Sequence, residues 1–194
     1  MAVREKINRK QQILETLARM LEQEQGRHIT TAALAKQVGV SEAALYRHFP
    51  GKAQMFEALI AFIEDSLFTR INLILSEESE AEARAYGIAT LVLGFAHKNP
   101  GITRLMHGDV LVGETEGLRQ RVEQVFNRLQ SQLKQVLREG HARQPLQDDP
   151  ADCALYLMAV IDGLIADYVR SGFNRSPMER WDALWRVYRR GVFG

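Results

Sequence analysis

The side chains best suited to recognising another molecule are concentrated near the N-terminus of the chain. Hydroxyl, imidazole and cationic groups come from Tyr46, Arg47, His48 and Lys52. Just before them stand Ala43 and Ala44, whose small side chains would let a helix approach base edges and thymine methyl groups closely. Cations at the rim of such a helix neutralise phosphates. The combination is typical of a surface that binds double-stranded DNA.

The spacing within residues 31–49 predicts two short helices joined by a tight turn. Gly39 can adopt the positive φ that a sharp turn between helices often needs, and the small Ala35 stands where the helices cross. The Ser41 hydroxyl can cap the second helix by accepting a hydrogen bond from its first turn. Such a helix-turn-helix presents the N-terminus of its second helix to the major groove. A plain helical hairpin inside a bundle is the alternative that the spacing alone leaves open.

The distribution of charge favours the DNA-binding interpretation. The 194 residues carry 25 Lys and Arg against 24 Asp and Glu, which gives a net charge of only +1. Residues 1–55, however, hold nine basic and five acidic side chains, so that they carry +4 and the remainder carries −3. A basic arm precedes the helix-turn-helix and contains Arg4, Lys6, Arg9 and Lys10. Such an asymmetry between the parts of a chain points to a nucleic-acid-binding end.

The rest of the chain shows helical periodicity, and no stretch alternates like a strand. We expect an all-α protein of about nine helices, with an N-terminal three-helix helix-turn-helix domain at 1–52 and a C-terminal helical dimerisation bundle at 53–194. Helices are expected at 5–24, 31–37, 41–48, 52–75, 82–98, 116–141, 151–171 and 178–190, with one or two turns within 102–112. The acidic stretch 76–82 is expected to be a loop, and the residues at 99–101 are expected to stop a helix.

The last two expected helices have wider apolar faces than one domain needs. These faces include Leu157, Ile161, Leu164, Tyr168, Trp181 and Trp185. We therefore expect a four-helix interface between two copies of the chain, which would set paired recognition helices about 34–36 Å apart on a near-palindromic site. The alternative is that the helix pair covers the core of its own chain.

The sequence offers little for other classes of function. A single cysteine, Cys153, cannot form an internal disulfide, and the five histidines show no spacing typical of a metal site. No phosphate-binding glycine loop and no nucleophile elbow is present. No apolar run reaches the length of a membrane span, and residues 1–12 lack the apolar core of a secretory signal. We therefore expect a cytoplasmic protein that is not an enzyme and that uses no metal or cofactor.

The helix-turn-helix resembles that of the TetR family of transcriptional regulators. The resemblance rests on Leu34-Ala35, on Gly39-Val40-Ser41, and on Leu45-Tyr46-Arg47-His48-Phe49 followed by Lys52. It implies a three-helix DNA-binding domain followed by a larger helical domain that dimerises. It also implies that DNA is contacted by the residues matching the family pattern: Thr31, Ser41, Ala43, Ala44, Tyr46, Arg47, His48 and Lys52.

The chain also resembles the nucleoid occlusion branch of that family, in stretches at 40–50, 62–75, 93–95, 99–104, 132–139 and 169–173. This likeness implies a dimer that, while bound to chromosomal sites, antagonises polymerisation of the division protein FtsZ and so keeps septa from forming over DNA. It further implies that the helices at 52–75 and 82–98 hold the C-terminal tail of FtsZ. The residues that we expect in that groove are Phe62, Arg70, Leu91, Gly94, Lys98 and Asn99.

Each of those groove residues also has a plainer interpretation, because Phe62 and Leu91 could be core and Arg70 and Lys98 solvated surface. The alternative function is a TetR-type transcriptional repressor released by a small-molecule ligand. Such a repressor would need a cavity of several hundred Å³ among the helices at 82–98, 116–141 and 151–171.

Overall fold

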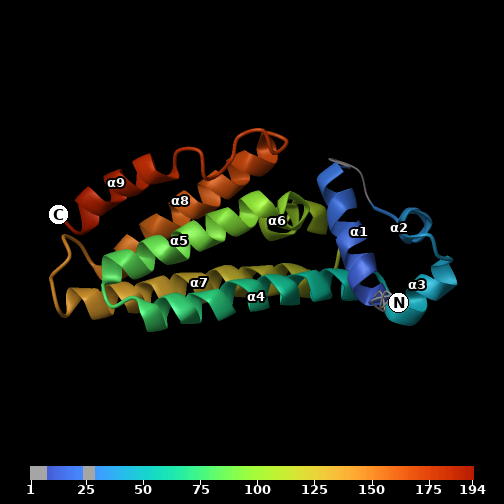
Figure 1. The fold of residues 1–194 in the computed structure, drawn as a ribbon, viewed down its shortest axis with the longest axis horizontal. Coiled ribbons are helices and arrows are strands. Elements are labelled where there is room, and N and C mark those ends of the chain that lie inside the picture. The colour runs from blue at the N-terminus through green and yellow to red at the C-terminus, as the bar shows by residue number, and fades with distance from the viewer. Residues whose placement is uncertain (1–7, 24–28) are drawn as a thin grey trace, which may run out of the picture.

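The computed structural model describes residues 8–23 and 29–194, and over these residues the protein consists of nine α-helices and one 3₁₀ turn (Figure 1). The predicted all-α class is confirmed. The helices are α1 (Arg9–Gln23), α2 (Thr31–Val38), α3 (Glu42–His48), α4 (Lys52–Glu77), α5 (Ala81–Lys98), α6 (Pro100–His107), α7 (Glu116–His141), α8 (Pro150–Arg170) and α9 (Trp181–Val192), and the 3₁₀ turn η1 is Asp109–Leu111. None of the helices in the described residues is long and apolar enough to cross a membrane.

One helix boundary is as expected and another differs. Helix α5 ends at Lys98, directly before the residues at 99–101 that were expected to stop it, and α6 begins immediately afterwards at Pro100. Proline fits the first position of a helix, where its missing N–H would have no partner in any case. The loop expected at 76–82 is shorter than predicted, because α4 continues to Glu77 and α5 begins at Ala81, which leaves residues 78–80 between the two helices. The part of the first expected helix that precedes residue 8, with Arg4 and Lys6 of the basic arm, lies outside the described residues.

The C-terminal part of the molecule is an elongated bundle. Figure 1 shows α4 and α7 running side by side along one edge, with α5 and α6 in the middle and α8 and α9 at the opposite edge; the packing of α4 on α7, α5 on both and α8 on α7 agrees with this view. The apolar stripe of α7 is buried in the bundle, and Leu129, Leu133 and Leu137 are fully covered. Burial of such stripes supplies most of the stability of a helix in a protein of this kind.

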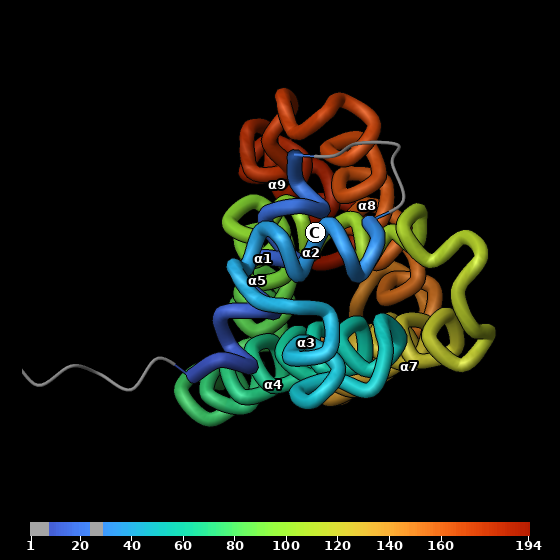
Figure 2. The backbone as a smooth tube through the Cα atoms, turned by 90° about the vertical axis from the view of Figure 1, so that its right-hand side faces the viewer, coloured from blue at the N-terminus to red at the C-terminus, as the bar shows by residue number. Residues whose placement is uncertain are grey.

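The helix-turn-helix lies at one end of this bundle, which Figure 2 views end on. Helix α1 joins the two parts, because it packs on α2 and α3 and also on α6. The contact with α6 is close: a Cβ at Gly101 would overlap the carbonyl oxygen of Ala18. Only glycine permits this approach of one backbone to another.

A buried arginine fastens the same contact. Arg104 on α6 is 6% exposed and donates from one terminal nitrogen to the carbonyl oxygen of Leu21 on α1, at 2.8 Å. Its Nε and its other terminal nitrogen donate to a carboxylate oxygen of Asp109 in η1, at 2.8 and 2.6 Å. A planar guanidinium is suited to this fork-like arrangement, and burial makes the loss of either partner costly. Arg104 thus ties α1 to the start of the loop that leads to α7.

Candidate nucleic-acid interface

Both helices of the helix-turn-helix have a side-chain cap at the N-terminus, and the cap at Ser41 is the one predicted from the sequence. Thr30 accepts a hydrogen bond from the backbone N–H of Ala33 at 3.2 Å, and Ser41 accepts one from that of Ala44 at the same distance. Gly39 ends α2 with a left-handed backbone, φ +79°. Side-chain caps satisfy N–H groups that a helix cannot pair internally. The turn between α2 and α3 is therefore specified locally.

One face of α3 is anchored and the other is free. Leu45 is completely buried, and Phe49 at the C-terminal cap is 6% exposed. On the other face, Ala43 and Arg47 are exposed, and Tyr46 is 44% exposed. The N-terminal turn of α3 is thus presented at the end of the molecule with two small side chains at its tip.

The eight residues expected to face DNA lie in the helix-turn-helix and at the start of α4, at one end of the molecule. Ser41, Ala43, Tyr46 and Arg47 are exposed, whereas Thr31, Ala44, His48 and Lys52 are half-buried. None of the eight is buried in the core. The arrangement can offer hydroxyl donors, two cations and a close backbone approach to one duplex.

A hydrogen-bonded cluster positions part of this surface. The hydroxyl of Thr31 at the start of α2 donates to the carboxylate of Glu42 at 3.1 Å and lies 3.2 Å from the hydroxyl of Tyr46. This cluster joins α2 to both ends of α3. Sequence reasoning left Glu42 out of the contact set, because nothing in the spacing shows that its carboxylate turns back towards α2.

Lys52 is placed differently from the other expected contacts. Its Nζ lies 2.7 Å from a carboxylate oxygen of Glu114, in the loop before α7, and 5.3 Å from the centre of the Phe56 ring. The side chains of Lys52 and Glu114 are only 22% and 19% exposed. This pair could not be predicted from the sequence, because its members belong to segments far apart in the chain.

The six residues expected in a partner groove are only partly brought together. Phe62, Lys98 and Asn99 line a groove of about 780 Å³, whose other wall is formed by α1 with Leu14, Ala18 and Arg19 among its residues. Phe62 is 49% exposed, and its ring centre lies 6.2 Å from that of Phe95. Arg70, Leu91 and Gly94 lie farther along α4 and α5 and do not line this groove. The wall contributed by α1 was not expected from the sequence.

Five of the six residues expected at the dimer interface are instead buried in the core of their own chain. Leu157, Ile161, Tyr168, Trp181 and Trp185 are between 0% and 7% exposed, and Leu164 is half-buried. Trp181, for example, donates from its indole nitrogen to the hydroxyl of Thr90 on α5 at 2.7 Å. Helical periodicity marks an apolar face but does not say whether the same chain covers it. Of the six, only Leu164 is left partly accessible to a second copy.

A different apolar surface is left open on the same two helices. Leu155 and Tyr156 on α8 are 54% and 51% exposed, and Leu184 and Val187 on α9 are 37% and 52% exposed. We call these four residues the α8–α9 face.

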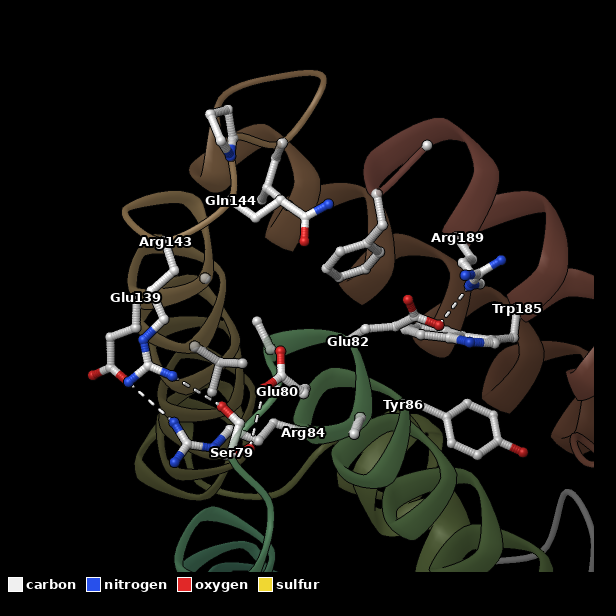
Figure 3. Close-up of a pocket in the computed structure, with 18 of the residues that line it drawn as sticks. Ser79, Glu80, Glu82, Arg84, Tyr86, Glu139, Arg143, Gln144, Trp185 and Arg189 are labelled. Atoms are coloured by element: carbon white, nitrogen blue, oxygen red, sulfur yellow. Dashed lines mark hydrogen bonds and ion pairs between the residues drawn. The ribbon is translucent and has the colours of Figure 1, made fainter.

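A cavity of about 840 Å³ opens at the far end of the bundle, between the start of α5, the end of α7 and α9 (Figure 3). Its charged walls are largely paired internally, since Arg189 donates to Glu82 at 2.6 Å and Arg84 to Glu139 at 3.1 Å. Tyr86 donates to Asp182, and this bond to a carboxylate raises the pKa of the tyrosine. The cavity lies at the end of the bundle, not among α5, α7 and α8, where a releasing ligand was considered.

The fold is shared with solved regulators. The MbdR regulator from Azoarcus sp. CIB superimposes with a TM-score of 0.81 at 18% identity, over 94% of this chain and 98% of that one. The ketosteroid regulator KstR2 of Mycobacterium tuberculosis gives 0.79 at 17% identity, over 97% and 96%. At such identities the likeness establishes the architecture alone.

Sequence comparisons establish the family. Residues 13–59 match the model for bacterial regulatory proteins of the tetR family, and residues 79–192 match the tetracyclin repressor-like C-terminal domain of the SlmA-like type. The chain therefore belongs to the TetR family of DNA-binding regulators, which implies that it binds DNA, forms a dimer and is not an enzyme.

Within that family the chain is similar to proteins named nucleoid occlusion factor SlmA. It is 60% identical to the one from Marinomonas sp. (strain MWYL1), over 94% of this chain and 93% of the relative. It is 53% identical to the one from Alteromonas mediterranea, over 95% of each. The predicted resemblance is confirmed, and identity over the whole chain supports a nucleoid occlusion factor of TetR type rather than a ligand-released repressor.

Replacement of Arg47 by alanine tests the DNA-facing surface. We expect Arg47→Ala to bind its selected duplex roughly tenfold more weakly. The slope of log affinity against log salt concentration should become shallower by about 1.8, because each of the two half-sites loses one phosphate contact worth about 0.9. Fluorescence anisotropy over a salt series measures both quantities. Arg138→Ala, an exposed arginine near the end of α7, removes the same charge as a control. An unchanged slope in Arg47→Ala would remove Arg47 from the interface.

Proposed function

We propose that this protein is a dimeric nucleoid occlusion factor that, while bound to a near-palindromic chromosomal site, antagonises FtsZ polymerisation by holding the C-terminal tail of FtsZ. The observation that carries the proposal is the half-exposed Phe62 in the groove beside α1, in a chain whose relatives at 53–60% identity are named nucleoid occlusion factors. The protein would then act in the cytoplasm, on the nucleoid.

In this proposal, residues 1–52 form the DNA-binding unit and residues 53–194 the dimerisation and partner-binding unit. The N-terminal turn of α3 enters the major groove, where Ala43 and Ala44 allow close approach and Ser41 and Tyr46 supply hydroxyl groups. Thr31, Arg47, His48 and Lys52 contact the phosphate backbone around it, and such contacts fix the register of the protein on DNA.

The groove beside Phe62 fits a peptide with an apolar anchor and carboxylates near it. Phe62 offers the apolar contact, supported by the ring of Phe95. Exposed Arg19 on α1 and Lys98 on α5 stand at its two sides, and neither forms an ion pair with any residue that the structure describes. Aromatic and arginine side chains of this kind carry much of the affinity at peptide-binding surfaces.

The remaining expected groove residues would extend this footprint along the two helices. Arg70 is exposed on α4, and a Cβ at Gly94 on α5 would meet no atom of the chain within 4 Å. The space over Gly94 and the half-buried Leu91 would accommodate the peptide beyond Phe62.

Two substitutions on opposite walls of the groove test this site. We expect Phe62→Ala to weaken binding of a fluorescein-labelled FtsZ C-terminal tail peptide about 30-fold, because a central aromatic anchor contributes about 2 kcal/mol. Arg19→Ala should weaken it about threefold, as expected for a partly exposed charge. Arg9→Ala, on the opposite side of α1 and outside the groove, is the matched control.

Anisotropy titrations of the peptide measure these affinities, and DNA binding of each variant is measured in parallel. Peptide affinities of Phe62→Ala and Arg19→Ala that match that of Arg9→Ala would show that the tail binds elsewhere.

The α8–α9 face is the proposed dimer interface in place of the buried set. Leu155 and Tyr156 are exposed on α8, and Leu184 and Val187 are exposed on α9. The two helices lie at one edge of the bundle (Figure 1), and the ring of Tyr156 lies 5.7 Å from that of Tyr188 on α9. A Cβ at Gly163 or at Gly191 would meet no atom of the chain within 4 Å, so helices of a second copy could approach closely there. Two such faces related by a two-fold axis form a four-helix contact.

A charge placed on this face should prevent dimerisation. We expect Val187→Glu to weaken dimer association about 100-fold or more, because the two-fold axis brings two uncompensated carboxylates into an apolar contact. Sedimentation equilibrium at micromolar concentration measures the change. Val112→Glu introduces the same charge at another exposed valine, 62% exposed in the loop before α7, and should leave the dimer intact. A dimeric Val187→Glu would place the interface on another surface.

A further inference from the structure

The pairing of Lys52 with Glu114 brings a carboxylate from the C-terminal part of the chain to the edge of the DNA-facing surface. Lys52 is the first residue of α4 and follows α3 directly. Its ammonium lies 2.7 Å from the Glu114 carboxylate, and both side chains are about four-fifths covered. A lysine in this pair does not present a free charge to a phosphate.

The position of Glu114 is fixed by the segment that carries it. Its backbone N–H donates to the carbonyl oxygen of Leu111 at 3.1 Å, and Leu111 itself is 1% exposed. Gly113 turns the chain before it with φ +85°. The segment begins at Asp109, which Arg104 holds at 2.6 Å. The carboxylate therefore lies on an anchored loop. Holding it beside Lys52 costs less conformational entropy there than it would on a mobile loop.

Residues 104–114 thus touch the DNA-binding unit at two places. Arg104 binds the backbone of α1 through Leu21, and Glu114 binds the start of α4 through Lys52. The first contact is buried and does not involve the DNA-facing surface. The second involves a side chain that a phosphate would need.

We propose that Glu114 competes with a DNA phosphate for Lys52 and thereby restrains the affinity of the protein for DNA. This inference rests on the proposed contact between Lys52 and DNA. Only the released ammonium can neutralise a phosphate and free a counterion, and a carboxylate left beside it repels the same phosphate. DNA binding therefore opens the pair between Lys52 and Glu114, and any change that moves the loop away from α4 tightens binding.

Replacing Glu114 by glutamine tests the competition in the full-length dimer. The probe is a fluorescein-labelled duplex selected from random sequence by the unmodified protein. We expect Glu114→Gln to bind it roughly tenfold more tightly, with a salt slope that is little changed, because Lys52 contacts a phosphate in both proteins once DNA is bound. Glu116→Gln removes the same charge two residues away, where Glu116 is 69% exposed and pairs only loosely with Arg119, at 3.9 Å. This control should change affinity much less.

A double-mutant cycle with Lys52→Gln identifies the route of the effect. Competition predicts that most of the gain from Glu114→Gln disappears when Lys52 is absent, and that only the relief of repulsion between carboxylate and phosphate is left. An undiminished gain without Lys52, equal effects of Glu114→Gln and Glu116→Gln, or weaker binding by Glu114→Gln would each overturn it.

The cycle also separates this inference from the proposed DNA contact. If Lys52→Gln weakens binding equally with and without Glu114, the contact between Lys52 and DNA stands and the competition fails. If Lys52→Gln has no effect in either background, the contact itself is wrong. Thermal unfolding of each variant confirms that the fold is retained.

Discussion

The close packing of α6 on α1 is the constraint on which the rest of the structure depends. Gly101 admits the backbone of Ala18 where any larger residue would collide with it, and Arg104 secures the contact through the carbonyl of Leu21. Because α1 also packs on α2 and α3, this contact sets where the recognition helix stands relative to the bundle. Two such units can meet one DNA site only if the bundle holds each of them at a fixed position.

The groove beside Phe62 also depends on the contact between α1 and α6. Its floor belongs to α4 and to the junction of α5 and α6, and its other wall is α1. At the rim of the groove, Lys10 of α1 also lies over the ring of Phe49, which ends α3, at 5.8 Å from its centre. A peptide in the groove would therefore contact the helix that positions α3. If the bound peptide favours one position of α1 and so changes the affinity for DNA, bound DNA must change the affinity for the peptide by the same factor.

Local features could be predicted from sequence, and features that depend on distant segments could not. Helical periodicity was enough to predict the helices. Caps such as those at Thr30 and Ser41 act within a few residues of the helix that they begin, so the helix-turn-helix could also be predicted from local sequence. The same periodicity did not show that Trp181 and Trp185 are buried in their own chain, since an apolar stripe looks alike whether its own chain or a second copy covers it. The pairing of Lys52 with Glu114 depends on how the folded chain brings distant segments together.

In the proposed function, DNA binding and the control of FtsZ belong to one protein. Light scattering of assembling FtsZ, with this protein present and with or without its selected duplex, tests this combination. We expect the scattering signal to fall when protein and duplex are both present, and to fall less with the protein alone. A signal that is unchanged by the protein, with and without the duplex, would show that the protein does not act on FtsZ and would favour a regulator that acts on transcription alone.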